Sequence, residues 1–230
     1  GSSDGSAEWL QGLAQARGFD LILQANAGVC RALNRAIRER ARGEFIALLG
    51  SDDLWDPRKL ELQLARLGEV PGAELCFSQA RSFTQAPDDA YGAAFPKRPR
   101  EGEIVSFVFW RQHVPAGTLL FTRALYDALG GFDEALREED WDFVIRAAAR
   151  TRFAAVPRPL LLYRAHPTNT MRSRPRAAIF HQKALILSKN FALVSPLRWF
   201  GAVTLHFVHD ILLHGFLRLF HRHRPARDHR

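Results

Sequence analysis

The sequence predicts an α/β fold in which helices flank a mostly parallel β-sheet. Short apolar segments alternate with amphipathic helical patterns through the first 171 residues. The apolar segments 19–24, 43–50 and 73–83 show little polar alternation, which is typical of strands buried on both faces. With 47% hydrophobic residues, the 230-residue chain has enough apolar side chains for one large domain with an appendage.

Apolar residues recur at helical spacing between the predicted strands. Pro57 is typical of the first turn of a helix, and Leu60, Leu64 and Leu67 would form the buried face of that helix. Residues 84–103 are rich in Pro, Gly and Asp, which indicates a loop of the kind found at active sites. Helices are expected over 7–17, 28–41, 57–67 and 137–150, further strands over 116–123 and 153–166, and helices again from about 175.

The chain is basic, with a net charge of +8 and a pI of about 10.3. This excess favours anionic partners, although a solvated basic surface explains it equally well. A nucleic-acid partner is not expected, because no aromatic and basic residues interleave in a known binding pattern. Cys30 and Cys76 lie in apolar-periodic stretches and are expected to be buried free thiols in a reducing compartment.

Two adjacent carboxylates, Asp52 and Asp53, follow the apolar segment 43–50. Neighbouring carboxylates at the end of a buried strand repel each other and are costly to desolvate, and a cation or polar ligand would remove that cost. Ligands of open α/β sheets collect beyond the carboxyl ends of the strands, where this pair would lie. Asp52 could equally cap the helix that begins near Pro57.

Four stretches, taken together, resemble one enzyme family. They are "QANAGVCRALNRAI" (24–37), "GEFIALLGSDDLWDPRKLELQ" (43–63), "GGFDEALREEDWDFVIRAAA" (130–149) and "PLLLYRAHPTNTM" (159–171). In this order they resemble the family 2 glycosyltransferases of the Rossmann-like GT-A fold. The resemblance implies a domain over 1–171 that lacks the family's first two strands, because "GSSDGSAEWL" (1–10) matches the loop after the second.

The resemblance also implies a reaction and a set of site residues. A sugar would pass with inversion from a nucleotide-sugar donor to an acceptor hydroxyl in surface or exported glycan synthesis, the acceptor being a glycan or a lipid-linked molecule. Asp140 would be the general base, with Glu139 as the rival, since one helical step turns a side chain by about 100°. Asp52 and His166 would contact a divalent cation, Mg²⁺ or Mn²⁺. Donor contacts would come from Asn26, Gly28, Asn34, Ser51, Asp53, Trp55 and Glu139.

Gly50 departs from the family's pattern, which has an acid at the first position of its D-x-D motif. We expect this change to weaken metal and donor binding without abolishing it. Leu33 also replaces the usual arginine. These departures keep open a second class of function, a non-catalytic binding or scaffold domain derived from such an enzyme.

Structural roles are expected for two residues beside Asp140. Trp141 would anchor its helix through burial of its indole ring. Asp142 would pair with Arg146 one helical turn later rather than react.

The C-terminal part, 172–230, is expected to be a helical appendage. Over 196–222 a polar stripe interrupts an apolar pattern, which disfavours a membrane-spanning helix. We expect an amphipathic helix on an anionic membrane surface, with the protein cytoplasmic and peripheral on the inner face of the cell membrane. A helix docked on the catalytic core or on a partner is an equal alternative. The stripe consists of Arg198, His206, Asp210, His214 and Arg218.

Overall fold

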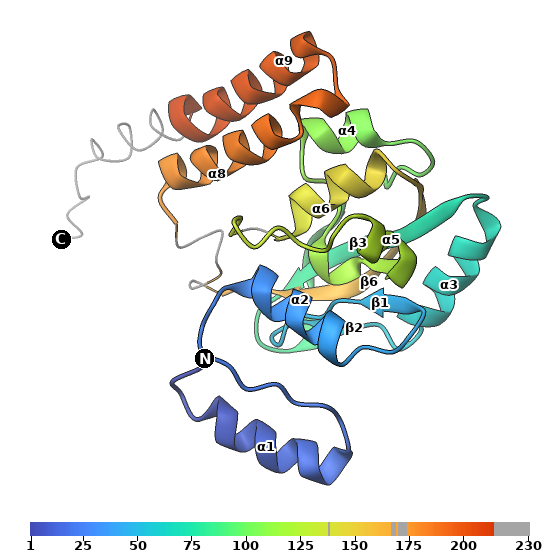
Figure 1. Ribbon diagram of the computed structural model, residues 1–230, viewed down its shortest axis with the longest axis vertical. Helices are drawn as coiled ribbons and strands as arrows, with labels where there is room; N and C mark the ends of the chain where they lie inside the picture. The colour runs from blue at the N-terminus through green and yellow to red at the C-terminus, as the bar shows by residue number, and fades with distance from the viewer. Residues whose placement is uncertain (138, 167–168, 170–173, 214–230) are drawn as a thin grey trace, which may run out of the picture.

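The computed structural model describes residues 1–137, 139–166, 169 and 174–213. A curled sheet lies at the centre, with helices on both sides and a helical pair at the C-terminal end (Figure 1). The helices are α1 (Ser6–Arg17), α2 (Val29–Glu39), α3 (Lys59–Glu69), α4 (Val105–Trp110), α5 (Arg123–Ala128), α6 (Glu139–Ala148), α8 (Arg176–Lys189) and α9 (Pro196–Phe207). The strands are β1 (Phe45–Ala47), β2 (Leu54–Trp55), β3 (Ala73–Phe83), β4 (Tyr91–Phe95), β5 (Leu120–Thr122) and β6 (Arg152–Arg164).

The α/β class is confirmed, but the expected mostly parallel pairing is wrong for the described strands. The sheet order is β1-β5-β3-β6-β2, with β4 paired to β3. Only β3 and β6 run parallel among these pairs, with Phe77 opposite Ala155, and the other described pairs are antiparallel. Apolar strand segments show that a strand is buried, but its direction depends on its neighbours in the sheet, which periodicity does not reveal.

Three predicted strands differ in extent from the structure. The segment 19–24 forms no strand, because no described strand lies beside it to take its backbone hydrogen bonds. The strand expected over 43–50 shortens to β1, and the strand expected over 116–123 shortens to β5. By contrast, β3 has the bounds that the sequence predicts, and the helix α1 is also found where expected.

Helix α3 buries only one of the three leucines predicted to form its buried face, Leu67. Leu60 and Leu64 are each 41% exposed, whereas Lys59, Gln63 and Leu67 are buried. The reason is a polar contact, since Gln63 Nε2 donates a hydrogen bond to the backbone oxygen of Thr118 at 2.8 Å. This contact turns the helix so that its Lys59–Gln63–Leu67 side meets the sheet.

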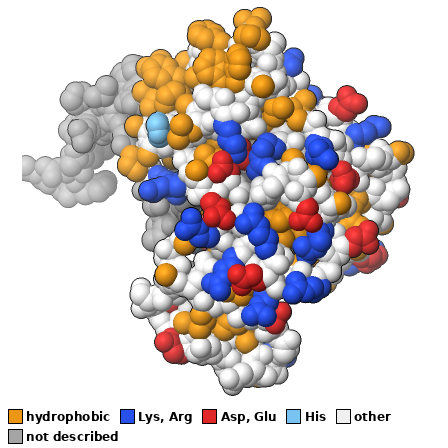
Figure 2. Space-filling view, viewed as in Figure 1, with side chains coloured by type: hydrophobic (Ala, Val, Ile, Leu, Met, Phe, Trp, Pro, Cys, Tyr) orange, Lys and Arg blue, Asp and Glu red, His pale blue; other side chains and the backbone are white. Residues whose placement is uncertain are grey.

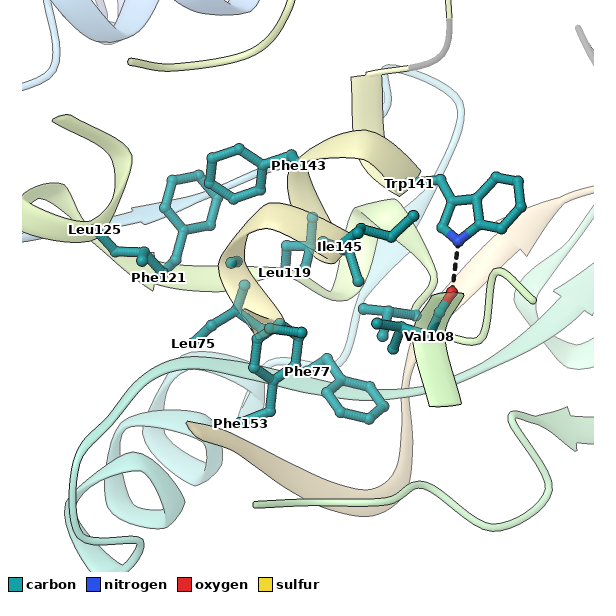
Figure 3. Packing of buried hydrophobic residues seen from close by; sticks show 14 of the residues in the cluster. Leu75, Phe77, Val108, Leu119, Phe121, Leu125, Trp141, Phe143, Ile145 and Phe153 are labelled. Carbon is teal, nitrogen blue, oxygen red and sulfur yellow. Dashed lines mark hydrogen bonds between the residues drawn. The ribbon is translucent and has the colours of Figure 1, made fainter. Parts of the chain in front are cut away.

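The main core lies between α6 and the sheet (Figure 3). Trp141 is buried there, and its Nε1 donates to the backbone oxygen of Val108 at 2.7 Å, so the predicted anchoring role is confirmed. Asp142 is buried and accepts from Arg146 Nε at 2.7 Å, as expected. Cys30 and Cys76 are buried free thiols.

The C-terminal helices pack on this same core. Ile186, Leu187 and Ala202 belong to the cluster that includes the sheet residues, and no residue of α1 is buried. In Figure 1, α1 accordingly stands apart from the body of the molecule. The division at 171/172 stays a prediction.

The polar stripe of the C-terminal helical stretch faces the body of the protein, and apolar residues such as Leu197 and Phe200 are exposed. Helix α9 ends at Phe207 and a π-helical segment, Val208–Leu213, follows. Arg198 donates to Ser106 Oγ at 2.6 Å, and His206 Nε2 lies 3.0 Å from the backbone oxygen of Trp110. These stripe residues therefore face the protein, because they find polar partners there. His214 and Arg218 lie outside the described residues, and within those described no helix is both long and apolar enough to cross a membrane.

Candidate active site

The Asp52–Asp53 pair lies in a tight turn between β1 and β2. The Asp53 backbone N–H donates to the Gly50 oxygen at 3.2 Å and closes the turn. Arg164, at the end of β6, holds the turn from the other side. Its backbone N–H donates to Asp53 Oδ1 at 2.9 Å, and its Nε donates to the Asp52 backbone oxygen at 3.0 Å. Two segments more than 100 residues apart thus fix the direction of the Asp53 carboxylate and the backbone at Asp52.

His166 joins Asp52 directly. Its Nε2 lies 3.0 Å from Asp52 Oδ2 and 2.9 Å from Asn169 Nδ2. A protonated Nε2 donates to the carboxylate, whereas an unprotonated Nε2 accepts from the amide. Asn169 Oδ1 also accepts from the His166 backbone N–H at 2.7 Å, which fixes the loop that carries the imidazole.

The half-buried Asp53 holds its proton more tightly than an exposed carboxylate. Burial raises the pKa of Asp53 above its ordinary value, and the neighbouring charge of Asp52 raises it further. The hydrogen bond from the Arg164 backbone opposes both effects. A cation bound here would favour the ionised form and remove the repulsion between the two carboxylates.

Asp52 and His166 are suitable contacts for a small divalent cation. Among the described residues, no group of three acidic, histidine or cysteine side chains is arranged to hold a metal by itself. Mg²⁺ in phosphate-transferring sites is held by one or two carboxylates and completes its shell with water and substrate phosphates. The Asp52 carboxylate, whose side chain is 41% exposed, meets that requirement.

Trp55 packs behind this turn. Its Nε1 donates to the Gly117 oxygen at 2.9 Å, and the buried Lys59 Nζ lies 4.2 Å from the centroid of its ring. A Cβ placed on Gly117 would lie 3.5 Å from Asp53 Oδ2, so the backbone at Gly117 directly borders the acidic turn. The indole therefore joins the acidic turn to the segment that carries Gly117.

Asp140 lies in the first turn of α6, as the sequence predicts. Gln112 Nε2 donates to Asp140 Oδ2 at 2.7 Å, and the Trp141 backbone N–H donates to Asp140 Oδ1 at 2.8 Å. Burial raises the pKa of Asp140, although both hydrogen bonds favour the ionised form. A carboxylate with a raised pKa is a stronger base once ionised, which suits removal of a hydroxyl proton.

The segment 111–118 borders both carboxylate sites. Gln112 contacts Asp140 near one end of it, and Gly117 lies against Asp53 at the other. Val114 is buried, and Thr118 Oγ1 donates to the Pro115 oxygen at 2.7 Å, so the segment is anchored along its length. The five backbone steps from Gln112 to Gly117 span at most about 18 Å, so Asp140 and the acidic turn lie in the same region of the molecule.

The other predicted donor residues lie elsewhere or make other contacts. Asn34 is buried and makes four hydrogen bonds: it accepts from Tyr126 Oη and the Phe132 N–H, and donates to the Phe132 oxygen and Glu134 Oε1. It therefore joins α2 to the segment 130–134. Four predicted donor residues remain. Asn26 and Gly28 line a separate hollow of about 640 Å³ with Gly1 and Ser2, and Ser51 is exposed in the turn. The Glu139 side chain lies outside what the structure describes.

The sequence analysis missed three residues that shape the site. Arg164 and Asn169 lie within the matched stretch "PLLLYRAHPTNTM", so the motif itself was a signal for them. Gln112 lies in no matched stretch. Only its position next to Asp140 in the folded chain identifies it.

Comparison with known proteins gives consistent sequence matches. The model for Glycosyl transferase family 2 matches residues 1–126. The chain is similar to the uncharacterized glycosyltransferase YwdF of Bacillus subtilis, at 29% identity over 144 residues that cover 61% of this chain and 52% of YwdF. It is also similar to the putative teichuronic acid biosynthesis glycosyltransferase TuaG of B. subtilis, at 42% identity over 65 residues that cover 27% of this chain and 25% of TuaG.

Solved structures share the fold. S. aureus TarS 1–349 in complex with UDP-GlcNAc aligns with a TM-score of 0.66 and 15% identity, over 92% of this chain and 62% of TarS. The mannosyltransferase PcManGT from Pyrobaculum calidifontis, in complex with GDP-Man and Mn²⁺, aligns with a TM-score of 0.60 and 18% identity, over 90% of this chain and 58% of PcManGT.

The fold is the GT-A fold of these glycosyltransferase structures. The chain belongs to glycosyltransferase family 2, whose match covers more than half of it. It spans about half the length of the curated relatives that it matches.

Proposed function

We propose that the chain transfers a sugar, with inversion, from a nucleotide-sugar donor to an acceptor hydroxyl in glycan synthesis. The observation that carries this proposal is the partly buried Asp140, held by Gln112 on a segment that also borders the acidic turn at Asp53. The glycosyltransferase relatives support sugar transfer, and TuaG supports a glycan as the product. TarS and PcManGT, in complex with UDP-GlcNAc and GDP-Man, support a nucleotide sugar as the donor.

In this proposal Asp140 accepts the proton of the acceptor hydroxyl while that oxygen attacks the sugar. Gln112 keeps the carboxylate in place by donating to Oδ2 and leaves Oδ1 with the Trp141 backbone N–H. The second lone pairs of both oxygens remain for the acceptor, since each carboxylate oxygen can accept twice. Glu139 stays the rival base.

Asp52 and His166 would hold the divalent cation, Mg²⁺ or Mn²⁺, and Asp53, Ser51 and Trp55 would border the donor. When bound, the cation supplies charge neutralisation for the departing nucleoside diphosphate. Arg164 would keep the Asp53 carboxylate in place and hold the backbone of the turn at Asp52, because its two hydrogen bonds reach both residues. PcManGT contains Mn²⁺, which supports this choice of cation.

A donor screen tests the proposal. Calorimetry with Mn²⁺ on a protein extended to the length of its relatives should detect UDP- or GDP-sugar binding. Asp52→Asn should weaken that binding, and Asp56→Asn, in the same loop but paired with the Arg58 backbone, should not. Binding that ignores both Mn²⁺ and Asp52 would contradict the donor site.

A second candidate function is a non-catalytic binding domain. Gly50 favours it, since the turn has one carboxylate fewer than the family pattern. Donor binding in the extended protein without sugar transfer to any glycan or lipid-linked acceptor would support this candidate.

We also propose that the protein is cytoplasmic and lies peripherally on an anionic membrane, on the inner face of the cell membrane. Leu197 is 83% and Phe200 64% exposed on α9, and Figure 2 shows hydrophobic side chains gathered at the top of the view, where α9 lies in Figure 1. Later in the sequence, 221–230 contains a cluster of arginines. An exposed apolar helical face together with a basic segment of sequence suits an interface with anionic lipid.

Flotation with vesicles of phosphatidylcholine and phosphatidylserine tests the membrane proposal. The double variant Leu197→Glu, Phe200→Glu should lose most of the binding. The matched control is Leu60→Glu, Leu64→Glu, which adds the same charges to another exposed helical face. Equal flotation of both variants would contradict a role for α9.

A further inference from the structure

A second, smaller cavity lies beside the proposed base. It has a volume of about 170 Å³ and is formed by residues 111–112 and α6 together with the C-terminal helical segments. We call it the basic pocket. It is lined by Arg111, Gln112, Trp141, Lys183, Leu205, His206 and His209.

The lining contains cationic groups and no carboxylate. Lys183 and His209 both contact Asp210, which is buried behind them, at 2.8 Å each. The charges of Lys183 and Asp210 cancel each other, so Asp210 does not neutralise the charge of Arg111. Arg111 is exposed and makes no hydrogen bond or ion pair with a described residue.

His206 adds polarity without charge. Its Nε2 faces the backbone oxygen of Trp110, which only accepts, so this nitrogen carries the proton and donates. Burial, with the nearby charge of Lys183, lowers the pKa of His206 to about 4, and the ring is neutral near pH 7. The imidazole is thereby fixed as a wall of the pocket.

The position of the basic pocket is the decisive observation. Gln112 lines it and also donates to Asp140 Oδ2 at 2.7 Å. An anion in the pocket is therefore one side chain away from the proposed base. Guanidinium and ammonium donors at a pocket suit the several acceptor oxygens of a phosphate group.

We propose that the basic pocket binds a phosphate group of the acceptor and so places an acceptor hydroxyl at Asp140. This inference rests on the proposed function for the role of Asp140, but the binding of phosphate does not. The substrate class is a phosphate-bearing glycan or polyol, or a lipid-borne phosphate. Arg111 is a binding and positioning residue in this assignment.

Calorimetric titration of the 230-residue chain at low salt tests the pocket without any donor. Inorganic phosphate and glycerol 3-phosphate should bind, and glycerol should not. Arg111→Gln should weaken binding about 10- to 100-fold, the loss of one charge-assisted hydrogen bond. Arg150→Gln, an exposed arginine near the other end of α6, is the matched control and should bind as the unchanged chain does.

Two further arms separate the sources of the phosphate. Flotation compares vesicles of phosphatidylcholine with vesicles that also contain phosphatidic acid. Binding of soluble phosphates supports a glycan or polyol acceptor, and Arg111-dependent binding of phosphatidic acid alone supports a lipid-borne one. Binding of acetate as tight as that of phosphate, or phosphate binding that Arg111→Gln leaves unchanged, would overturn the assignment, as would no binding in either arm.

In an active, extended protein, Arg111→Gln should raise KM for a phosphate-bearing acceptor and leave donor binding unchanged. Failure of donor binding would contradict the proposed function while leaving the titrations with phosphate interpretable. The two proposals therefore fail in distinguishable ways.

Discussion

Substitution of Gly50 by Asp should make the stability of the chain depend strongly on a divalent cation. A Cβ at this position would lie 3.1 Å from Asp52 Oδ1 and 3.2 Å from Asp53 Oδ2. The new carboxylate therefore enters directly between two others. Without a cation, all three repel one another, and with one they become possible ligands or hydrogen-bond partners of its water shell.

The magnitude follows from these distances. Two unit charges about 4 Å apart interact by about 1 kcal/mol in water and about 4 kcal/mol at an effective dielectric constant of 20. The Asp52 side chain is 41% exposed, so the lower value applies to it, and the repulsion from half-buried Asp53 is at least as strong. We expect a loss of about 2 kcal/mol in EDTA, which lowers the melting temperature by about 4–8 °C.

Excess Mn²⁺ should reverse most of that loss. If the added acid tightens cation binding about 10- to 100-fold, the extra stabilisation at saturation is about 1.4–2.7 kcal/mol. The assay is thermal unfolding in EDTA and in Mn²⁺. Gly68→Asp is the control, because nothing lies within 4 Å of a Cβ there.

One result would refute this reasoning. If Gly50→Asp lowers the melting temperature equally in EDTA and in Mn²⁺, the added carboxylate does not help to bind a cation. If Asp52→Ala also leaves the response to Mn²⁺ unchanged, residues 50–53 are not a metal site.

Three other substitutions have expected outcomes. Asp140→Asn should lower turnover of an extended, active protein by two or more decades, and near-normal turnover would move the base to Glu139. Because burial raises the pKa of Asp140, its ionised form destabilises the fold at neutral pH. The variant should therefore melt no lower than the unchanged chain at pH 7, and any gain in melting temperature should disappear below about pH 4. Lys59→Met should stabilise the fold by about 2–3 kcal/mol at pH 7 in urea unfolding, because burial lowers the pKa of Lys59 to about 8 and its Nζ has no hydrogen-bond partner. This gain in stability should shrink as the pH rises from about 8 to 10 and the buried amine loses its proton, and a gain that stays constant would contradict the buried charge. Asn34→Ala should cost about 3–5 kcal/mol, because it leaves buried partners such as the Phe132 N–H unsatisfied, and a loss under 1 kcal/mol in the same assay would show that water replaces the amide.

The sequence predicted those elements whose apolar pattern agrees with their burial in the folded chain. β3 is apolar and buried along most of its length, so its bounds were readable. The segment 19–24 has an equally apolar pattern but no described strand beside it, and a strand depends on that neighbour. The buried face of α3 was misread because Gln63 reaches backbone oxygens of two other segments, a tertiary contact that outweighs the burial of Leu60 and Leu64.

For the candidate site, the motifs predicted the acids and not the residues that hold them. Asp52 stands out because an acidic pair follows an apolar segment, and Asp140 stands out because its stretch resembles a motif of the family. Gln112 carries no such signal, since it precedes a loop with no family pattern. Its function becomes visible only when α6 brings Asp140 to within 2.7 Å of it.

The segment 111–118 explains how a site with parts so distant in sequence can act as a unit. Gly117 borders Asp53 of the acidic turn, Gln112 holds the base, and Arg111 lines the basic pocket. A short segment anchored by buried Val114 cannot move one of these residues without moving the others, because close-packed interiors transmit displacement. In the proposed assignment, the separations among the donor cation, the base and the acceptor phosphate depend on this one stretch of backbone. We therefore expect acceptors to be selected by the distance from their phosphate to their reactive hydroxyl.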